Sequence, residues 1–389
     1  MYKIRQDLCT GCACCDCPHG AIVKNKNKMT INELCTACGF CLQACPVNAI
    51  VKQDLTQTPS SKHEYKDILV YVEHSRGKIA SVTYELIGKA LELANSVSQQ
   101  VHCLFIGTEK DSGELENLLD YGVAKVYTYL HEEFAYFRAD VYTNVFHDCV
   151  QRCRPTAVLV GASSVGRSLA PRIATRCHTG LTADCTGLSM RPNTDLVQTR
   201  PAFGGNIMAQ IITKNHRPQF ATVRAKVMDL PAKTAPSGVV EKIEIGSHLL
   251  KSNIALSNVR KKQQVEGIEN AQVLVVAGSP IKTARDMEML HELAQLLDGR
   301  VGATRPVIES GLADYSMQIG LSGRSVRPKL IITCGVSGAV QFTAGMNNAE
   351  YIFAINTNAE APIMKIAHYA AVGDLFEIVP SLIKSIKGR

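Results

Sequence analysis

Cysteines crowd the start of this chain, where nine of its fifteen lie within the first 45 residues. Four of them form the run C-x2-C-x2-C-x3-C, followed by proline, at Cys35, Cys38, Cys41 and Cys45. Four thiolates that converge from one short piece of chain are the ligand set of a cubane iron–sulfur cluster. The two-residue spacers let a loop wrap three sulfurs around one face of the cubane, and the fourth lies beyond a short helical turn. The run therefore predicts a chain that carries electrons.

A second run lies upstream, where residues 9–18 read Cys-Thr-Gly-Cys-Ala-Cys-Cys-Asp-Cys-Pro. Together the two runs resemble a two-cluster ferredoxin, in which the fourth cysteine of each run reaches the other cluster. If that exchange holds, the ligand sets are Cys9, Cys12, Cys15 and Cys45 for one cluster and Cys35, Cys38, Cys41 and Cys17 for the other. The upstream run is two residues short before its Cys-Pro step, and Cys14 competes with Cys15 for the third place. The sequence leaves that choice open.

The cysteine content also bears on the compartment and on other metals. A zinc ribbon uses paired cysteines, but nine cysteines with two Cys-Pro steps fit it poorly. Thiolate-bound clusters and many unpaired cysteines suit a reducing compartment. No apolar run approaches 18 residues, and no basic segment leads into an apolar one, so neither a membrane span nor a secretory signal is readable. We expect a cytoplasmic protein with no membrane partner.

Composition is that of an ordinary globular protein, with 46% hydrophobic and 20% charged residues over 389 positions. The formal charge of +7 is modest, and its densest stretch, residues 24–28, lies between the cysteine runs and reads as a solvated loop. Nucleic-acid binding would favour a basic stripe with interleaved aromatics, whereas this chain has no Trp and 6% aromatic residues. We therefore expect no nucleic-acid partner.

Beyond the cysteines the sequence alternates between short β-branched runs and helical patterns. Residues 51–65 are polar and read as a linker, and residues 231–267, rich in Pro, Ser, Asn and Lys, read as another. Alternating strands and helices of ten to fifteen residues imply parallel βαβ units. The expected fold is α/β, with two doubly wound (Rossmann-like) α/β domains and an N-terminal ferredoxin-like α+β domain. The expected boundaries are residues 1–55, 66–230 and 266–389.

One glycine segment could suggest a site for nucleotide phosphates. Residues 161–168 read Gly-Ala-Ser-Ser-Val-Gly-Arg-Ser, but Arg167 stands where a Walker A loop needs a compact lysine. No G-x-G-x-x-G follows a strand, so the sequence announces no nicotinamide site. We expect that the chain does not bind NADH by itself.

A second glycine segment lies in the last domain, where residues 335–345 read Gly-Val-Ser-Gly-Ala-Val-Gln-Phe-Thr-Ala-Gly. It follows an apolar strand and is expected to open a helix from Gly338. A strand, a glycine turn and a helix N-terminus present backbone N–H groups that suit a pyrophosphate or a flavin edge. The alternative is a tight turn with close packing.

Here the sequence resembles the FAD-binding domain of an electron-transferring flavoprotein α subunit. The matching segments are residues 301–305, 318–323, 335–345, 354–356, 361–364 and 374–376. The middle domain is similar to the same family through residues 161–172, 179–186, 200–206 and 217–227. The resemblance thus covers residues 66–389, and the ferredoxin-like head covers the rest.

The resemblance implies roles for individual residues. Arg305 would be the cation beside the flavin ring, where a fixed guanidinium stabilises reduced, anionic flavin. Thr304 and Ser322 would donate hydrogen bonds to the ring or its linker. A surface ion pair is the alternative for Arg305.

The other expected contacts lie along the remainder of the cofactor. Ser337 and Gly338 would contact the ribityl-pyrophosphate region, and Asn356 and Asp374 the adenosine end, although Asp374 could instead cap the last helix. No catalytic residue is implied. The full set of expected FAD-binding residues is Thr304, Arg305, Gln318, Ile319, Gly320, Leu321, Ser322, Gly323, Ser337, Gly338, Ala339, Val340, Gln341, Phe342, Asn356 and Asp374.

Three positions depart from the usual family pattern. Phe342 stands where many relatives have His, Leu321 stands where Gln is common, and residues 277–280 replace a Gly-Gly-Arg-Gly-like turn. Together they remove polar groups near the expected flavin. This puts the flavin potential in doubt but leaves the fold expectation unchanged.

What the resemblance implies is an electron-transfer subunit that is not catalytic alone. It implies FAD, two 4Fe–4S clusters, an Etf β subunit as heterodimer partner, a flavin-dependent dehydrogenase of acyl-CoA or enoyl-CoA type, and soluble ferredoxin. The head suits the bifurcating members that oxidise NADH, such as those serving caffeoyl-CoA reductase or lactate dehydrogenase. The alternative is a self-contained ferredoxin-dependent flavin oxidoreductase, for which we find no nucleophile–base pair.

Overall fold

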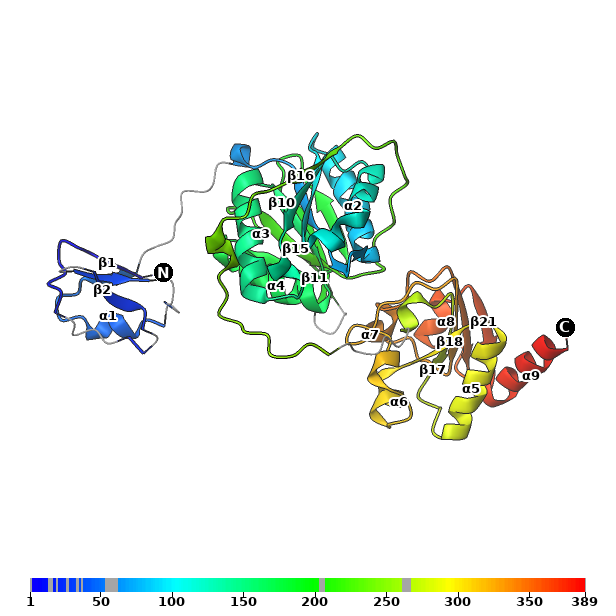
Figure 1. Ribbon diagram of the computed structural model, residues 1–389. Helices are drawn as coiled ribbons and strands as arrows, with labels where there is room; N and C mark the ends of the chain where they lie inside the picture. The colour runs from blue at the N-terminus through cyan, green and yellow to red at the C-terminus, as the bar shows by residue number, and fades with distance from the viewer. Residues whose placement is uncertain are drawn as a thin grey trace. The chain divides into compact units, whose positions relative to one another are not determined.

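The computed structural model describes residues 2–12, 17–18, 20–25, 28–32, 35, 38–52, 62–202, 207–260 and 267–388. The chain forms two compact units, Met1–Ser61 and Lys62–Arg389. In the part that is described, no helix is long and apolar enough to cross a lipid bilayer. Figure 1 shows the first unit in blue and the two α/β parts of the second from cyan to red.

The first unit is a small α+β fold built from two short antiparallel pairs. Strand β1 (Tyr2–Ile4) pairs with β4 (Ile50–Lys52), and β2 (Ile22–Asn25) pairs with β3 (Lys28–Ile31). Helix α1 (Phe40–Ala44) lies between β3 and β4 in the sequence. Its apolar core includes two of the expected ligands, Cys41 and Cys45. The pairing of β1 with β4 joins the beginning and the end of this unit, and so brings the two cysteine runs into one small fold.

The first α/β domain is organised around a parallel sheet. Its seven described strands, in spatial order, are β11 (Leu181–Cys185), β15 (Gln219–Val223), β10 (Ala157–Gly161), β5 (Ile68–Tyr71), β8 (Val101–Gly107), β9 (Lys125–Leu130) and β16 (Val239–Lys242). Helix α2 (Ser81–Asn95) packs on one face, and α3 (Ala139–Cys153) and α4 (Ser164–Arg176) pack on the other. Figure 1 shows these helices on opposite sides of the sheet. The doubly wound expectation is confirmed.

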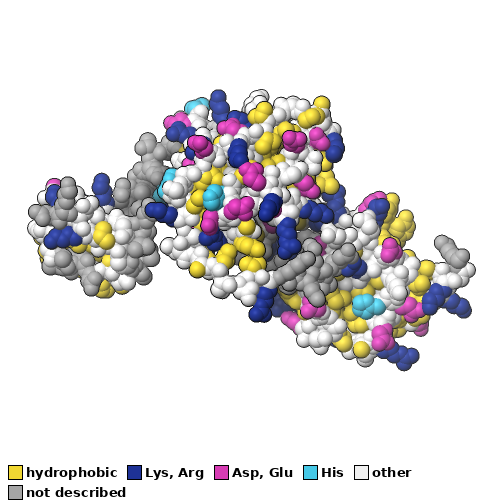
Figure 2. Space-filling view, in the orientation of Figure 1, with side chains coloured by type: hydrophobic (Ala, Val, Ile, Leu, Met, Phe, Trp, Pro, Cys, Tyr) yellow, Lys and Arg dark blue, Asp and Glu magenta, His cyan; other side chains and the backbone are white. Residues whose placement is uncertain are grey.

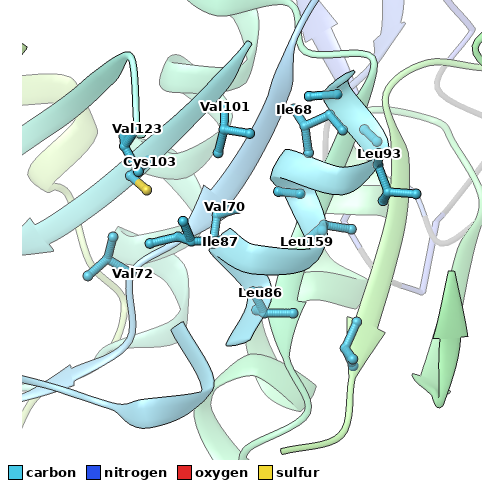
Figure 3. Packing of buried hydrophobic residues seen from close by; sticks show 14 of the residues in the cluster. Ile68, Val70, Val72, Leu86, Ile87, Leu93, Val101, Cys103, Val123 and Leu159 are labelled. Atoms are coloured by element: carbon cyan, nitrogen blue, oxygen red, sulfur yellow. The ribbon is translucent and has the colours of Figure 1, made fainter. Parts of the chain in front are cut away.

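Strand β5 shows why this sheet needs helices on both faces. Ile68 and Val70 belong to the apolar cluster under α2, whereas Leu69 and Tyr71 belong to the cluster under α3 and α4. Successive side chains of a strand point to opposite faces, so a strand that is apolar throughout must be covered twice. Figure 3 shows the α2 side of this packing, where Leu86 and Ile87 of the helix face the strand residues.

Two parts of this domain were not predicted. An antiparallel sheet of β12 (Gly187–Met190), β13 (Leu196–Ala202) and β14 (Ile207–Ile211) interrupts the βαβ alternation. Strand β16 lies inside the segment read as a linker, so that reading is wrong for Val239–Lys242, which pairs in parallel with β9. A stretch with Pro231, Pro236 and Gly238 precedes it, and Val239 and Val240 stay exposed at the sheet edge, which explains why the sequence did not reveal a strand there. A short hairpin, β6 (His74–Ser75) with β7 (Lys78–Ile79), follows β5.

The second α/β domain has a smaller parallel sheet. Its five described strands, in spatial order, are β18 (Arg300–Ala303), β17 (Val273–Ala277), β19 (Leu330–Cys334), β20 (Tyr351–Asn356) and β21 (Tyr369–Val372). Helices α5 (Ala284–Leu296) and α9 (Leu375–Lys387) share one apolar cluster, and α7 (Val340–Thr343) and α8 (Pro362–Ile366) border the other. Helix α6 (Arg305–Glu309) follows β18. On the face of the molecule shown in Figure 2, Lys and Arg are interspersed with Asp and Glu.

Candidate functional site

Four of the expected cluster ligands line one cavity in the first unit. Cys17, from the upstream run, lies with Cys35, Cys38 and Cys41, from the downstream run. The remaining wall is largely apolar and includes Ala21, Ile22, Ile31 and Phe40. Gly39 makes this geometry possible because its φ is 82°, a left-handed conformation that glycine adopts readily, and because a Cβ there would lie 3.1 Å from the Tyr2 hydroxyl oxygen.

A second cavity gathers the ligands expected for the other cluster. Cys9 and Cys12 line it together with Cys45, beside apolar residues such as Ile4 and Met29. The backbone N–H of Ala49 donates to Cys45 Sγ at 3.3 Å. Hydrogen bonds to the sulfurs are one of the levers that set a cluster's potential. Cys15, the fourth expected ligand, and its competitor Cys14 lie outside the described residues.

The structure therefore places the fourth cysteine of each run with the other run. That is the exchanged arrangement expected for two cubanes. Burial raises the pKa of the Cys41 thiol, and the neighbouring thiols of Cys35, Cys17 and Cys38 raise it further. Thiolates gathered in an apolar cavity repel one another unless a cationic cluster is present, so the chemistry of this donor set fits an iron–sulfur cluster.

A single metal ion would need several ligands close together. Among the described residues, no three side chains of His, Cys, Asp or Glu converge closely enough to hold a single metal ion. This is compatible with a cubane, because each of its thiolates binds a different iron and the ligands surround a larger body than one ion.

The second candidate site lies at the carboxyl edge of the sheet in the second α/β domain. The strand order reverses between β17 and β19, and open α/β sheets bind their ligands at such a point. The loops that follow these two strands touch each other, since the Gly278 N–H donates to the Cys334 carbonyl at 2.9 Å. Most of the expected FAD-binding residues lie on loops at this edge.

The glycine turn after β19 approaches helix α8 so closely that a side chain would not fit. Gly338 has φ of 82°, and a Cβ there would lie 2.2 Å from the backbone nitrogen of Ile363. Ser337 is exposed, and its carbonyl accepts the Ile363 N–H at 3.2 Å. Such a cradle lets backbone N–H groups approach a pyrophosphate, so the residues present fit the phosphate part of FAD.

The helix expected from Gly338 begins two residues later, at Val340, and has four residues. Helix α7 spans Val340–Thr343, so its dipole adds little and the turn itself must provide the N–H groups. Ala339, Val340 and Gln341 are exposed, whereas Phe342 is 6% exposed and packs with Ile319 and Val336 in an apolar cluster. Phe342 therefore contributes to the domain core.

Residues 318–323 form a loop packed against α7. The Leu321 N–H donates to the Gln341 carbonyl at 2.7 Å, and Gln318 Nε2 donates to Ser322 Oγ at 2.8 Å. A Cβ on Gly320 would lie 2.5 Å from the Gln341 oxygen, and one on Gly323 would lie 2.3 Å from the Gln318 oxygen. The structure thus brings residues 318–323 and residues 337–342 together.

Thr304 and Arg305 follow β18. Thr304 is buried, and its hydroxyl donates to the Ala277 carbonyl at 3.1 Å, so the group offers lone pairs to a ligand while its proton is engaged. The Arg305 side chain is 70% exposed and pairs through Nε with Glu309 Oε1 at 2.7 Å. Exposed pairs of this kind contribute little stability, so an anion at the sheet edge could compete for the guanidinium.

Asn356 and Asp374 both make local hydrogen bonds. Asn356 Nδ2 donates to the Val336 carbonyl at 2.8 Å, which ties β20 to the glycine turn. Asp374 accepts the Phe376 N–H at 2.9 Å as the N-cap of α9. The capping role weighed for Asp374 is therefore present, and contact with an adenosine stays a prediction for both residues.

Sequence reasoning missed Tyr315, whose hydroxyl donates to the Ser322 carbonyl. It also assigned no role to Arg224, which lies in a segment noted for its family pattern and which donates to the Leu321 carbonyl at 2.9 Å. Neither residue belongs to a spaced motif. Their contacts arise from tertiary packing, and no signal in the sequence could have revealed them.

Comparison with known proteins covers all three regions of the chain. Residues 68–247 match the family described as "Electron transfer flavoprotein domain", residues 267–347 match "Electron transfer flavoprotein FAD-binding domain", and residues 29–51 match "4Fe-4S binding domain". The last match includes the downstream cysteine run and not the upstream one.

Three individual relatives match most of the chain. The chain is 47% identical to subunit LctC of the lactate dehydrogenase (NAD(+),ferredoxin) of Acetobacterium woodii, over 96% of this chain and 89% of the relative. It is 42% identical to the electron transfer flavoprotein subunit alpha of Clostridium acetobutylicum, over 84% of this chain and 98% of the relative. It is 34% identical to the acryloyl-CoA reductase electron transfer subunit beta of Anaerotignum propionicum, over 84% of this chain and 96% of the relative.

Proposed function

This chain belongs to the electron transfer flavoprotein family, as an α-type subunit with a ferredoxin-like 4Fe–4S motif, and we propose that it relays single electrons within a bifurcating complex. The proposed partners are an NADH-oxidising Etf β subunit, which forms the heterodimer, soluble ferredoxin and a flavin-dependent dehydrogenase. The observation that carries the proposal is that one chain joins a cysteine-lined head to an FAD-binding domain. The 47% identity to a subunit of an NAD- and ferredoxin-linked enzyme supports it.

FAD would supply the exchange between the electron pairs of NADH and the single electrons of a 4Fe–4S cluster. The chain's own residues would hold and orient it. The glycine turn at Gly338 would present backbone N–H groups to the pyrophosphate, residues 318–323 would border the ring, and Arg305 would supply a positive charge near it. Asn356 ends β20 and Asp374 follows β21, and both would contact the adenosine end. A fixed cation beside the ring favours its anionic form and so tunes the potential.

The proposed clusters are two, with the ligand sets that the two cavities suggest. Cys17, Cys35, Cys38 and Cys41 would hold one, and Cys9, Cys12 and Cys45 with Cys15 would hold the other. Clusters of this type reach potentials near −400 mV, about that of soluble ferredoxin. A head with such clusters suits the low-potential branch of the complex.

The dehydrogenase partner has two candidates. The sequence suggested an acyl-CoA or enoyl-CoA type, and a 34% identical relative serves an acryloyl-CoA reductase. The 47% identical relative belongs to a lactate dehydrogenase. Its greater similarity and coverage favour a partner dehydrogenase that oxidises a 2-hydroxy acid.

The test is to purify the chain with the proteins encoded beside it and to measure ferredoxin reduction driven by NADH, or the reverse, with lactate and with an enoyl-CoA supplied in separate assays. The matched variant lacks residues 1–61, because the second unit begins at Lys62 and has its own sheets and cores. We expect the truncated complex to lose ferredoxin coupling while its dehydrogenase still reduces an artificial dye. Full coupling after truncation would contradict the proposed role of the head. Turnover by the chain alone would favour a self-contained oxidoreductase.

A further inference from the structure

The turn at residues 320–323 is held in place from several directions. The Gly323 N–H donates to the Gly320 carbonyl at 3.1 Å, which closes the turn. The Ser322 carbonyl accepts the Tyr315 hydroxyl, as described above, and the Leu321 N–H is held by α7. What remains to be fixed is the peptide group between Leu321 and Ser322, which can rotate as a unit within a closed turn.

That peptide group is held by the other α/β domain of the same unit. Arg224 follows β15, and its Nη2 donates to the Leu321 carbonyl at 2.9 Å. The Arg224 side chain is 12% exposed, and the same Nη2 lies 3.5 Å from Asp184 Oδ2. Asp184 is itself fixed, because its N–H donates to Thr222 Oγ1 at 2.9 Å and its carboxylate also pairs with Arg167. The guanidinium therefore bridges a rigid carboxylate of one domain and a turn of the other.

We propose that Arg224 is a positioning residue for the flavin-binding turn, and that it acts by setting the direction of the Ser322 N–H. In a trans peptide the C=O and the following N–H point in opposite directions. Holding the Leu321 carbonyl toward the first α/β domain therefore turns the Ser322 N–H away from it. Within the described residues, the Ser322 N–H donates to no protein group, so it remains available to a ligand.

Arginine is suited to this position in a way that lysine is not. The two N–H groups of its Nη2 lie in the plane of the guanidinium, so this one nitrogen serves the Asp184 carboxylate and the Leu321 carbonyl in fixed directions, whereas a lysine ammonium rotates freely. Among the described residues, Arg224 Nε is buried and has no hydrogen-bond partner. Burial lowers the pKa of Arg224, while Asp184 raises it and Arg167 and Arg200 lower it. Keeping the Arg224 guanidinium charged beside the turn therefore costs desolvation free energy.

The inference rests on the proposed function for the identity of the ligand, since it takes residues 318–323 to border a flavin. The contact between Arg224 and Leu321 does not depend on that assignment. Two other polar contacts join the same domains without touching the turn, from Asn348 Nδ2 to the Lys226 carbonyl at 3.0 Å and between Arg327 and Asp229 at 2.8 Å. They provide a matched control.

The experiment compares Arg224→Ala, Arg224→Lys and Asn348→Ala in the full chain with its β subunit. The first measurement is hydrogen exchange of the peptide 318–324 in the FAD-free protein. We expect about tenfold faster exchange in Arg224→Ala, the effect of losing one hydrogen bond to a charged group, and no change at this peptide in Asn348→Ala. The second is the visible circular dichroism and midpoint potential of the FAD-loaded protein, which should shift in Arg224→Ala, shift less in Arg224→Lys and stay constant in Asn348→Ala.

The outcomes separate the possible explanations. Unchanged exchange in a folded Arg224→Ala protein would overturn the proposal, and so would equal shifts in Arg224→Ala and Asn348→Ala, which would indicate general loosening of the domains. Should Arg224→Ala fail to fold, Arg224→Lys decides by the same two measurements. A wild-type protein that binds no FAD would refute the proposed function, while the exchange result would still test the contact.

Discussion

Gly338 and the backbone nitrogen of Ile363 lie so close that a Cβ on the glycine would stand 2.2 Å from that nitrogen. This contact fixes the glycine turn after β19 against helix α8 and shapes the cradle proposed for the pyrophosphate of FAD. A second glycine of the same domain, Gly311, has a similar φ of 77° but open space where its Cβ would be. Comparing alanine substitutions at these two glycines therefore separates the strain of a left-handed backbone from the effect of a blocked contact.

We therefore expect Gly338→Ala to weaken FAD retention by about tenfold or more, because the turn must move away from α8 and overpacking of this kind costs about 1–3 kcal/mol. Gly311→Ala pays a similar conformational cost and should keep its FAD. The measurement is the FAD-to-protein ratio after gel filtration at increasing dilution. Equal retention by the two variants would show that the cradle does not hold the cofactor.

Replacing Cys17 tests the exchange of ligands between the two cysteine runs. Cys17→Ser should remove the cluster bound by the downstream run, so that iron falls from about eight to about four per chain and one EPR-active centre remains. Cys153→Ser, which changes a half-buried cysteine of the other unit, should leave the iron content unchanged. Loss of the upstream cluster with the downstream one intact would mean that Cys17 serves its own run.

Substitutions of the two partners in the ion pair between Arg305 and Glu309 should shift the flavin potential in opposite directions. Arg305→Ala removes the cation near the proposed ring and should lower the flavin potential, by roughly 60 mV if the stabilisation lost is about 1.4 kcal/mol. Glu309→Gln frees the guanidinium from its 2.7 Å partner and should raise the potential. Because Arg305 is largely exposed, solvent screening should make both shifts in potential smaller than this figure. A titration with redox dyes measures them, and equal shifts in the same direction would remove Arg305 from the flavin's surroundings.

A buried carboxyl in the first α/β domain should make stability depend on pH. Burial raises the pKa of Glu73 above its ordinary value of 4.5, and the hydrogen bond that Ser163 donates at 2.6 Å offsets part of that rise. A raised pKa in the folded state means that the fold favours the protonated form, so this contribution to stability is lost as pH rises above 4.5 through the raised value.

The change Glu73→Gln should therefore raise the thermal unfolding midpoint at pH 8, with a difference from the wild type that shrinks toward pH 4. Glu360→Gln, which changes an exposed carboxylate, serves as the control. A constant difference across this pH range would show that Glu73 ionises as freely in the folded protein as in the unfolded chain.

The cysteine spacing and the glycine turn show how far the sequence could lead. The spacing of the run from Cys35 to Cys45 is set by covalent chain length, so it predicts the local ligand geometry directly. The family pattern then identified the expected flavin-binding residues, most of which lie at one edge of the sheet. The sequence could not reveal contacts that depend on tertiary packing, such as the one between Arg224 and Leu321. The sequence also did not reveal β16, because Val239 and Val240 form an exposed edge strand that directly follows a stretch rich in Pro, Ser and Gly.

Phe342 shows the same limit at a single residue. The departure from the family's usual His suggested a lost hydrogen bond to the flavin, yet the side chain is 6% exposed and packs with Ile319, Val336 and Met346. We expect Phe342→His to lower the free energy of unfolding of this domain by about 2 kcal/mol, since it buries a polar ring among apolar groups. Phe342→Leu, which keeps the site apolar, should cost less.

Thermal unfolding of the two Phe342 variants, followed with the visible spectrum of bound FAD, separates a core role from a flavin contact. A core residue gives a lower unfolding midpoint for Phe342→His than for Phe342→Leu, with an unchanged flavin spectrum in the folded protein. The opposite result, an unchanged midpoint with an altered spectrum in Phe342→His alone, would show that this position faces the ring in the loaded protein. In that case α7 would have to turn when FAD binds, because in this structure the ring of Phe342 points into the core.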